Sequence, residues 1–308
     1  MKPFASGIWP GLGATMNRRR ALSTALGLGT AGVAGMALAG CGGTALLPAI
    51  VNAEIIPKKD EASKDTPQQI FTAALIAEDL ATAFYYNGLI GGVIQDPNLA
   101  GVGGTATNVS ATGNVPNVGY LRGALSEEIT HANLLRSLIG GTAAANDPVQ
   151  TFYFPVGSFD MLGPFLTLLD ALESAFIGAY LTATQEFAQM AADTKSGAAT
   201  QVDQNGKAYT SVQLEYFAKV AASILGIESE HRALGRAINP SPKAIPANNL
   251  NYEQTDGLTA VYNGSGSAAA ALGPFLASGS NLSAYSLSTA LANAASVSLA
   301  TTGNPPQA

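Results

Sequence analysis

The chain has two histidines, and each of them follows a glutamate by three residues. One pair is Glu128 and His131, and the other is Glu228 and His231. On an α-helix this spacing places the carboxylate and the imidazole on one face, about one turn apart. A single Glu-x-x-His sequence is more often a surface pair than a ligand pair. Two of them that use every histidine in the chain instead indicate one metal site to which two helices contribute.

Two further glutamates complete the predicted ligand set. Glu78 is the only glutamate of the apolar segment 67–90, and the segment 158–194 holds Glu173 and Glu186. Glu173 shares its helical face with apolar residues, whereas Glu186 lies about 220° around the helix and is expected to face solvent. Four carboxylates and two imidazoles can hold two divalent first-row ions, with bridging carboxylates and one nitrogen on each ion. The predicted ligands are Glu78, Glu128, His131, Glu173, Glu228 and His231.

The pattern repeats in the two halves of the chain. Tyr85 follows Glu78 by seven residues and Tyr180 follows Glu173 by seven, so each tyrosine lies on the face of its glutamate. This position fits core residues as well as catalytic groups beside the metal site, and both interpretations stay open.

Other charged residues lie close to the ligands in the sequence without belonging to the predicted ligand set. Arg136 and Arg236 each follow a histidine by five residues and are expected at the surface. Glu127 and Glu230 are neighbours of ligands and are expected on solvated faces. Candidate partners behind the ligands are Asp79 and Asp170.

Four helices are required to position the six ligands. Apolar periodicity, glycine pairs and prolines predict helices over 67–90, 120–139, 158–194 and 208–238. The segment 91–119 has no period and is predicted to be a loop with short strands at most. After Pro240 the composition changes, and two helical patches are predicted, at 268–276 and 284–299. The chain is therefore predicted to be all-α.

Composition excludes some classes of function. Hydrophobic residues make up 47% of the 308 residues and charged residues only 12%, which is typical of a helical protein with polar loops. The formal net charge of -6 and the absence of a basic face that could hold phosphates exclude nucleic acid as a partner. Because Cys41 is the only cysteine, an intrachain disulfide is excluded as well.

The N-terminal segment resembles an export signal. Asn17-Arg18-Arg19-Arg20-Ala21-Leu22 is similar to a twin-arginine signal, and an apolar run follows over 21–38. The run ends in Leu38-Ala39-Gly40-Cys41, which resembles the cleavage box of a lipoprotein. A plain membrane anchor is the alternative, but a glycine-rich run of this length is marginal for spanning a bilayer. We expect a signal over 1–40, lipidation of Cys41, a tether over 41–66, and a periplasmic or cell-surface lipoprotein. If the cell has an outer membrane, Gly42 favours that location.

On these residues the chain resembles the ferritin-like superfamily of di-iron and di-manganese carboxylate proteins. The resemblance covers 67–240, and within it the exported bacterial proteins related to plant desiccation-related proteins look closest. It implies a four-helix bundle with a crossover between helices two and three, the six ligands above, and two iron or two manganese ions. The loop 91–119, the extension over 241–308 and a lipid anchor depart from the subunit of a closed storage shell. The chain also lacks the cysteine-rich electron-transfer module of rubrerythrins.

Three functions compete at this point. The leading hypothesis is an exported, lipid-anchored protein with a di-metal centre that handles ferrous iron or peroxide, as a ferroxidase, peroxidase or catalase would. The second is a stress- or desiccation-protective protein whose metal only holds the bundle together, and the third is a metal-free binding bundle. The expected partners are ferrous iron or a small oxidant, and the membrane through the lipid on Cys41. The sequence leaves a homodimer open as a further partnership.

Overall fold

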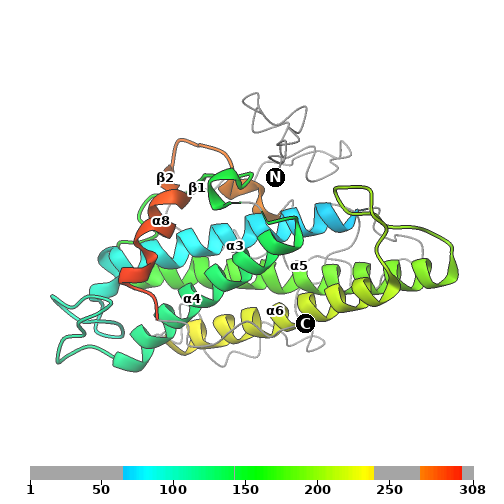
Figure 1. The fold of residues 1–308 in the computed structure, drawn as a ribbon. Coiled ribbons are helices and arrows are strands. Elements are labelled where there is room, and N and C mark those ends of the chain that lie inside the picture. The colour runs from blue at the N-terminus through cyan, green and yellow to red at the C-terminus, as the bar shows by residue number, and fades with distance from the viewer. Residues whose placement is uncertain (1–64, 142, 239–270, 300–308) are drawn as a thin grey trace, which may run out of the picture.

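The computed structural model describes residues 65–141, 143–238 and 271–299. It contains four long helices, which lie side by side (Figure 1). Contacts are most extensive between helices one and two and between helices three and four. The predicted all-α class and the helical bundle are therefore confirmed. The helices are α3 (Pro67–Ile90), α4 (Val115–Leu138), α5 (Leu162–Ser196) and α6 (Ser211–Ile238).

The predictions for the N-terminal segment lie outside the described residues. These are the export signal over 1–40, the lipidation site at Cys41 and most of the tether over 41–66. Within the described residues one helix, α5, is long and apolar enough to cross a membrane. However, 72% of its apolar window is buried inside the structure, so its composition is accounted for by the core of the bundle.

Capping residues decide where the helices begin. Helix α3 begins after Thr66 with a capping box. The Thr66 hydroxyl accepts a hydrogen bond from the backbone N–H of Gln69, and the Gln69 side-chain oxygen accepts one from the backbone N–H of Thr66. Helix α4 begins at Val115 rather than at the predicted Tyr120. Its cap is Asn114, whose side-chain oxygen accepts a backbone N–H of the first turn. The predicted start was wrong because this Asn-x-Pro signal lies inside a segment interpreted as loop.

The other two helices also differ from prediction at their ends. Helix α5 spans 162–196 instead of 158–194, and it ends at Gly197, which adopts the left-handed conformation with a φ of 77°. Helix α6 begins at Ser211 instead of 208, because the Thr210 hydroxyl accepts the backbone N–H of Gln213 and fixes the start.

The connection from α4 to α5 returns along the bundle. In Figure 1 the colours show that both helices run in the same direction, from the end that carries the loop 91–119 toward the opposite end. The connection contains a 3-10 turn, η2 (Ala144–Asn146), and strand β1 (Thr151–Pro155). It is the crossover that the ferritin-like resemblance implied.

The C-terminal segment packs on this crossover. Strand β2 (Leu282–Ser286) pairs antiparallel with β1, with Thr151 opposite Ser286 and Pro155 opposite Leu282. Helix α8 (Leu287–Asn293) follows and packs against α3. The helix predicted over 284–299 is therefore shorter, because its first residues pair with a strand whose side chains, such as Phe154, are fully buried. The short turns η4 (Gly273–Phe275) and η5 (Ala294–Ser296) flank these elements.

The segment 91–114 is irregular, as predicted, whereas 115–119 form the first turn of α4. It contains η1 (Gly92–Gln95) and an isolated bridge between Thr105 and Asn108. Gly101 makes its tight turn possible, since its φ of 76° is strained for residues with a side chain. Leu99 is fully buried, so the loop covers one end of the core.

The apolar core has two parts, one toward each end of the bundle. Along α3 the division falls between Leu75 and Ile76, and along α5 it falls between Phe176 and Tyr180. Glu78 and Glu173 lie close to these divisions. These two buried carboxylates therefore sit in the middle of the bundle, between two apolar layers.

We expect the C-terminal segment to contribute to the stability of the bundle. Leu287 of α8 is fully buried, so Leu287→Ala should lower the free energy of unfolding by about 2–5 kcal/mol, the usual cost of such a truncation in a core. Denaturant unfolding followed by circular dichroism measures this. The matched control is Leu234→Ala at a position that is 36% exposed, and it should cost much less. Equal costs for the two variants would mean that α8 is not part of the core.

Candidate metal centre

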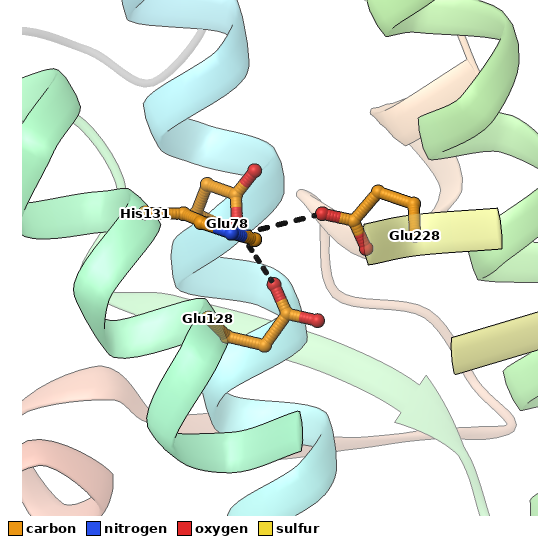
Figure 2. Close-up of side chains that lie close together, drawn as sticks. All are labelled: Glu78, Glu128, His131 and Glu228. Atoms are coloured by element: carbon orange, nitrogen blue, oxygen red, sulfur yellow. Dashed lines mark hydrogen bonds and ion pairs between the residues drawn. The ribbon is translucent and has the colours of Figure 1, made fainter. Parts of the chain in front are cut away.

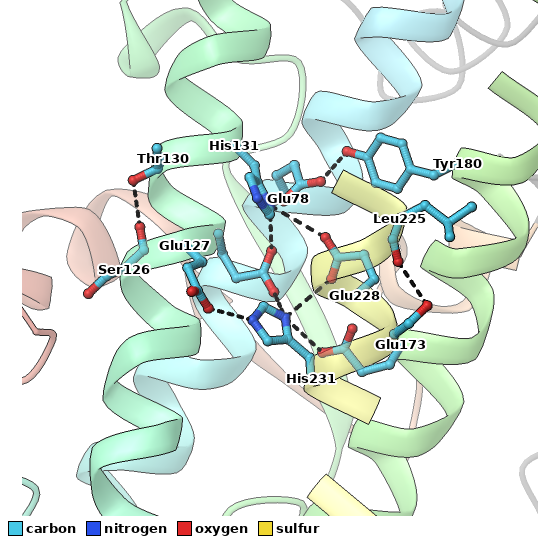
Figure 3. Close-up of polar contacts among 12 residues, drawn as sticks. Glu78, Ser126, Glu127, Thr130, His131, Glu173, Tyr180, Leu225, Glu228 and His231 are labelled. Atoms are coloured by element: carbon cyan, nitrogen blue, oxygen red, sulfur yellow. Dashed lines mark hydrogen bonds and ion pairs between the residues drawn. The ribbon is translucent and has the colours of Figure 1, made fainter. Parts of the chain in front are cut away.

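The structure brings the six predicted ligands together in the middle of the bundle. Each of the four helices contributes a glutamate, and α4 and α6 also contribute the histidines (Figures 2 and 3). Their ligand atoms form two groups, and within each group they lie within 4.8 Å of one another. Glu128 and Glu228 belong to both groups. One group is Glu78, Glu128, His131 and Glu228, and the other is Glu128, Glu173, Glu228 and His231.

Both histidines point the same ring nitrogen, Nδ1, at the shared carboxylates. Nδ1 of His131 lies 3.8 Å from Oε2 of Glu128 and 3.4 Å from Oε1 of Glu228. Nδ1 of His231 lies 3.0 Å from Oε1 of Glu128 and 3.3 Å from Oε2 of Glu228. Each shared carboxylate thus directs one oxygen toward each imidazole. This is the arrangement that two bridging carboxylates between two ions require.

Buried polar atoms without a partner support the fit to metal. Both oxygens of Glu128, both oxygens of Glu228, Oε2 of Glu173 and Nδ1 of His231 are buried with no hydrogen bond. Such atoms destabilise a protein unless something binds them. Oxygen and imidazole nitrogen are donors that first-row divalent ions accept, and two such ions would neutralise the four carboxylates. The cluster can therefore bind a pair of metal ions.

Without metal, the centre holds protons in place of cations. Burial raises the pKa of Glu78 and of Glu173 well above the ordinary range, and the neighbouring Glu228 raises both further. Burial alone would lower the pKa of the histidines, but the surrounding carboxylates raise the pKa of His131 and His231 well above the usual value. The metal-free centre is thus a set of groups that compete for protons.

Two tyrosines bind the two glutamates that are not shared. The Tyr85 hydroxyl donates to Oε1 of Glu173 at 2.5 Å, and the Tyr180 hydroxyl donates to Oε1 of Glu78. Burial and these carboxylates raise the pKa of both hydroxyls, so both stay protonated as donors. Each tyrosine reaches the glutamate of the other half, which requires α3 and α5 to run antiparallel. Both tyrosines thus lie beside the site, and each positions one glutamate by a hydrogen bond.

Glu127 and Tyr120 also contact the site, and neither was predicted to. Glu127 was expected on a solvated face, but its half-exposed carboxylate lies 2.8 Å from Nε2 of His231. This hydrogen bond lowers the pKa of Glu127. The Tyr120 hydroxyl donates to the backbone oxygen of His231 at 2.5 Å. Both contacts join α4 to α6, and spacing along one helix carries no signal for them. Glu230 is exposed, as predicted.

The arginines that follow the histidines form ion pairs. Arg136 is buried rather than at the surface as predicted, and it lies 2.6 Å from both Asp79 and Asp147. Arg236 lies 2.6 Å from Asp170. The partners of Asp79 and Asp170 are therefore arginines. Arg136 joins α3, α4 and the start of the crossover, which explains its burial.

We expect Arg136→Met to lower the free energy of unfolding by about 3–5 kcal/mol, because it leaves buried Asp79 and Asp147 without a counter-charge. Denaturant titration of the metal-free protein measures this loss. Adding Asp147→Asn to the same variant should recover part of the stability, since one of the two uncompensated carboxylates is then removed. A loss below about 1 kcal/mol would show that the ion pair contributes no more than an exposed one.

Glu186 corrects another prediction. It was expected to face solvent because it lies off the stripe of Glu173, yet it is only 8% exposed. Helix α5 packs against both α6 and α3, so a wider arc than one stripe is buried along it. Glu186 belongs to neither group of ligand atoms.

The fold and the site define a class of protein. It is a four-helix bundle with a crossover and a buried cluster of four carboxylates and two imidazoles that can bind two ions. A family model of the ferritin-like domain matches residues 66–239, more than half of the chain, and the chain belongs to this family. The predicted ferritin-like superfamily is thereby confirmed, while the exported, desiccation-related subgroup stays a prediction. No curated protein and no solved structure matches the chain.

Proposed function

We propose that this protein binds two iron or two manganese ions and uses them to oxidise ferrous iron or to turn over peroxide. One observation carries the proposal: two groups of four ligand atoms share the carboxylates of Glu128 and Glu228. A site built only to hold one structural ion needs no such shared pair. When bound, such a pair would supply electron transfer to a small oxidant.

The burial of the site supports a small substrate. Glu78, Glu173 and His231 are 1–2% exposed, and Glu128 and Glu228 are not exposed at all. His131 is 9% exposed, and Glu127 beside it on α4 is half exposed. These side chains offer almost no exposed surface to an organic substrate of ordinary size. Ferrous iron, oxygen and hydrogen peroxide are small enough to reach such a site, and ferrous iron or a small oxidant is the partner expected from the sequence.

Two tyrosines and two apolar layers surround the ligands. Tyr85 and Tyr180 hold Glu173 and Glu78 by hydrogen bonds from protonated hydroxyls. These hydroxyls are also the hydrogen donors closest to the unshared carboxylates, which supports the proposal that they take part in the reaction. The apolar layers on either side exclude water and strengthen the electrostatic interactions of the site.

Turnover assays test the proposal. Protein loaded with Fe(II) or with Mn(II) should consume oxygen when excess ferrous iron is added, or release oxygen from hydrogen peroxide. The matched control is Glu228→Gln, which should be inactive in both assays. Two tightly bound ions with no activity toward ferrous iron or peroxide would contradict the proposal and favour the stress-protective protein in which metal only stabilises the bundle.

We also propose that the chain is exported and anchored to the membrane by a lipid on Cys41, in the periplasm or at the cell surface. The twin-arginine-like segment at 17–22 and the box at 38–41 support this. Export by that route would deliver a folded protein, so metal could be bound in the cytoplasm beforehand. Mass spectrometry of the mature N-terminus tests it, and an unmodified Cys41 or an uncleaved signal would contradict it.

A further inference from the structure

We propose that the two metal positions are unequal: the position at His231 binds its ion more tightly, and the position at His131 is the one that exchanges its ion with solvent. This inference rests on the proposed function, because it presumes that the centre holds two ions. By donor type alone the positions are the same. Each has the two shared carboxylates, one unshared glutamate and one imidazole.

The difference lies behind His231. Its Nε2 is 2.8 Å from Oε2 of Glu127, while its Nδ1 faces the shared carboxylates (Figure 3). A carboxylate at Nε2 keeps the proton on that nitrogen and leaves the lone pair of Nδ1 free for an ion. The same hydrogen bond fixes the orientation of the ring and makes it a stronger donor.

Two tyrosines constrain His231 as well, one through its backbone and one through its ring. Tyr120 donates to its backbone oxygen at 2.5 Å, and the ring of Tyr85 lies edge-on to the imidazole at 5.7 Å between centroids. The His231 side chain is 1% exposed. The neighbouring residues therefore fix the orientation of the His231 ring before any ion binds.

His131 lacks this support. The residue before Glu128 is Glu127, but the residue before Glu228 is Ile227, so the second motif has no carboxylate at the equivalent position. Among the described residues, none donates to or accepts from Nε2 of His131. Its side chain is 11% exposed, against 1% for His231. The His131 ring is thus the less constrained of the two and the nearer to solvent.

The expected difference in metal affinity between the two positions can be estimated from other proteins in which a ligating histidine has a hydrogen-bond partner. Removing the partner of a ligating histidine typically weakens metal binding by about 10–100-fold. Glu127 supplies such a partner to one position only. We therefore expect the two dissociation constants of the full-length protein to differ by about that factor, with the His231 position filled first.

Calorimetric titration of the metal-free protein with Zn(II), which has no redox chemistry, tests the inference. The wild type should show two binding events. Glu127→Ala should weaken the tighter event by about 10–100-fold and leave the weaker one nearly unchanged. Glu127→Gln should restore part of the affinity, because an amide oxygen also accepts from Nε2. Glu230→Gln, which removes an exposed carboxylate next to His231, is the matched control and should change neither event.

A second measurement shows which of the two metal positions is filled first. Crystals with one equivalent of Zn(II) per chain should show anomalous scattering beside His231 and little beside His131. Ile227→Glu should tighten the weaker event by supplying the missing carboxylate. Two equal affinities in the wild type, a first ion beside His131, or an unchanged titration in Glu127→Ala would each overturn the inference while leaving the proposed function in place. A wild type that binds no ion would overturn the proposed function itself.

Discussion

Glu228→Gln is expected to reduce bound metal from two ions per chain to less than one, at metal concentrations that saturate the wild type. The reason is that Glu228 contributes to both groups of ligand atoms, so its loss removes a ligand from each ion and the bridge between them. The metal-free variant should nevertheless be at least as stable as the metal-free wild type, since it has one buried carboxylate fewer. Metal analysis by mass spectrometry and denaturant unfolding of the chelated proteins measure the two effects.

The matched control for this prediction is Glu230→Gln, two residues along the same helix, where the side chain is exposed. It should bind two ions as the wild type does. Two ions bound by Glu228→Gln would show that the shared carboxylate is not a bridging ligand, and a strongly destabilised metal-free variant would show that Glu228 has a structural role instead.

Chelation of the metal is expected to lower the melting temperature, and the difference from the loaded protein should increase with pH. A ligand that binds only the folded protein stabilises it by RT ln(1 + [L]/Kd), which is about 2.7 kcal/mol at a hundredfold excess over Kd. Thermal unfolding of the loaded and chelated proteins between about pH 5 and about pH 8 measures the difference.

The direction of the pH effect follows from the pKa shifts in the metal-free centre. Burial raises the pKa of Glu78 and Glu173, and the surrounding carboxylates raise that of His131 and His231. The folded protein therefore keeps protons that the unfolded chain releases. The unfolded chain releases them above the ordinary values of 4.5 for glutamate and 6.5 for histidine, so the metal-free protein loses stability as pH rises.

The loaded protein does not lose stability in this way, since ions replace the protons and bind more tightly as the ligands deprotonate. The control is Glu228→Gln, which should show little difference between loaded and chelated samples at any pH. Equal melting temperatures for the loaded and chelated wild type across this pH range would mean that metal does not occupy the buried cluster.

Helix periodicity explains how much of the site could be predicted from sequence. The spacing in Glu-x-x-His places Glu128 and His131 on one face, and the matched spacing of Glu78 with Tyr85 extends the same logic to α3. These are relations within a helix, where backbone hydrogen bonds fix the geometry. The number of helices, the central position of the ligands and the crossover follow from the same pattern and the ferritin-like resemblance.

Contacts between elements could not be predicted in this way. The hydrogen bond from Glu127 to His231 depends on how α4 and α6 pack, and burial of Glu186 depends on α5 having neighbours on more than one side. Burial of Arg136 depends on Asp147, which the crossover brings back to α4. The pairing of β1 with β2 joins segments far apart in the chain, so local propensity alone favoured a helix over the C-terminal residues.

The most direct test of the di-metal centre is the anomalous scattering of crystals saturated with Mn(II). Two peaks about 3.5–4 Å apart are expected, the usual separation of ions in two-metal sites, with the carboxylates of Glu128 and Glu228 between them. One peak should lie beside His131 and the other beside His231. A single peak, no peak, or manganese bound away from these six side chains would contradict the assignment of this cluster as a centre for two ions.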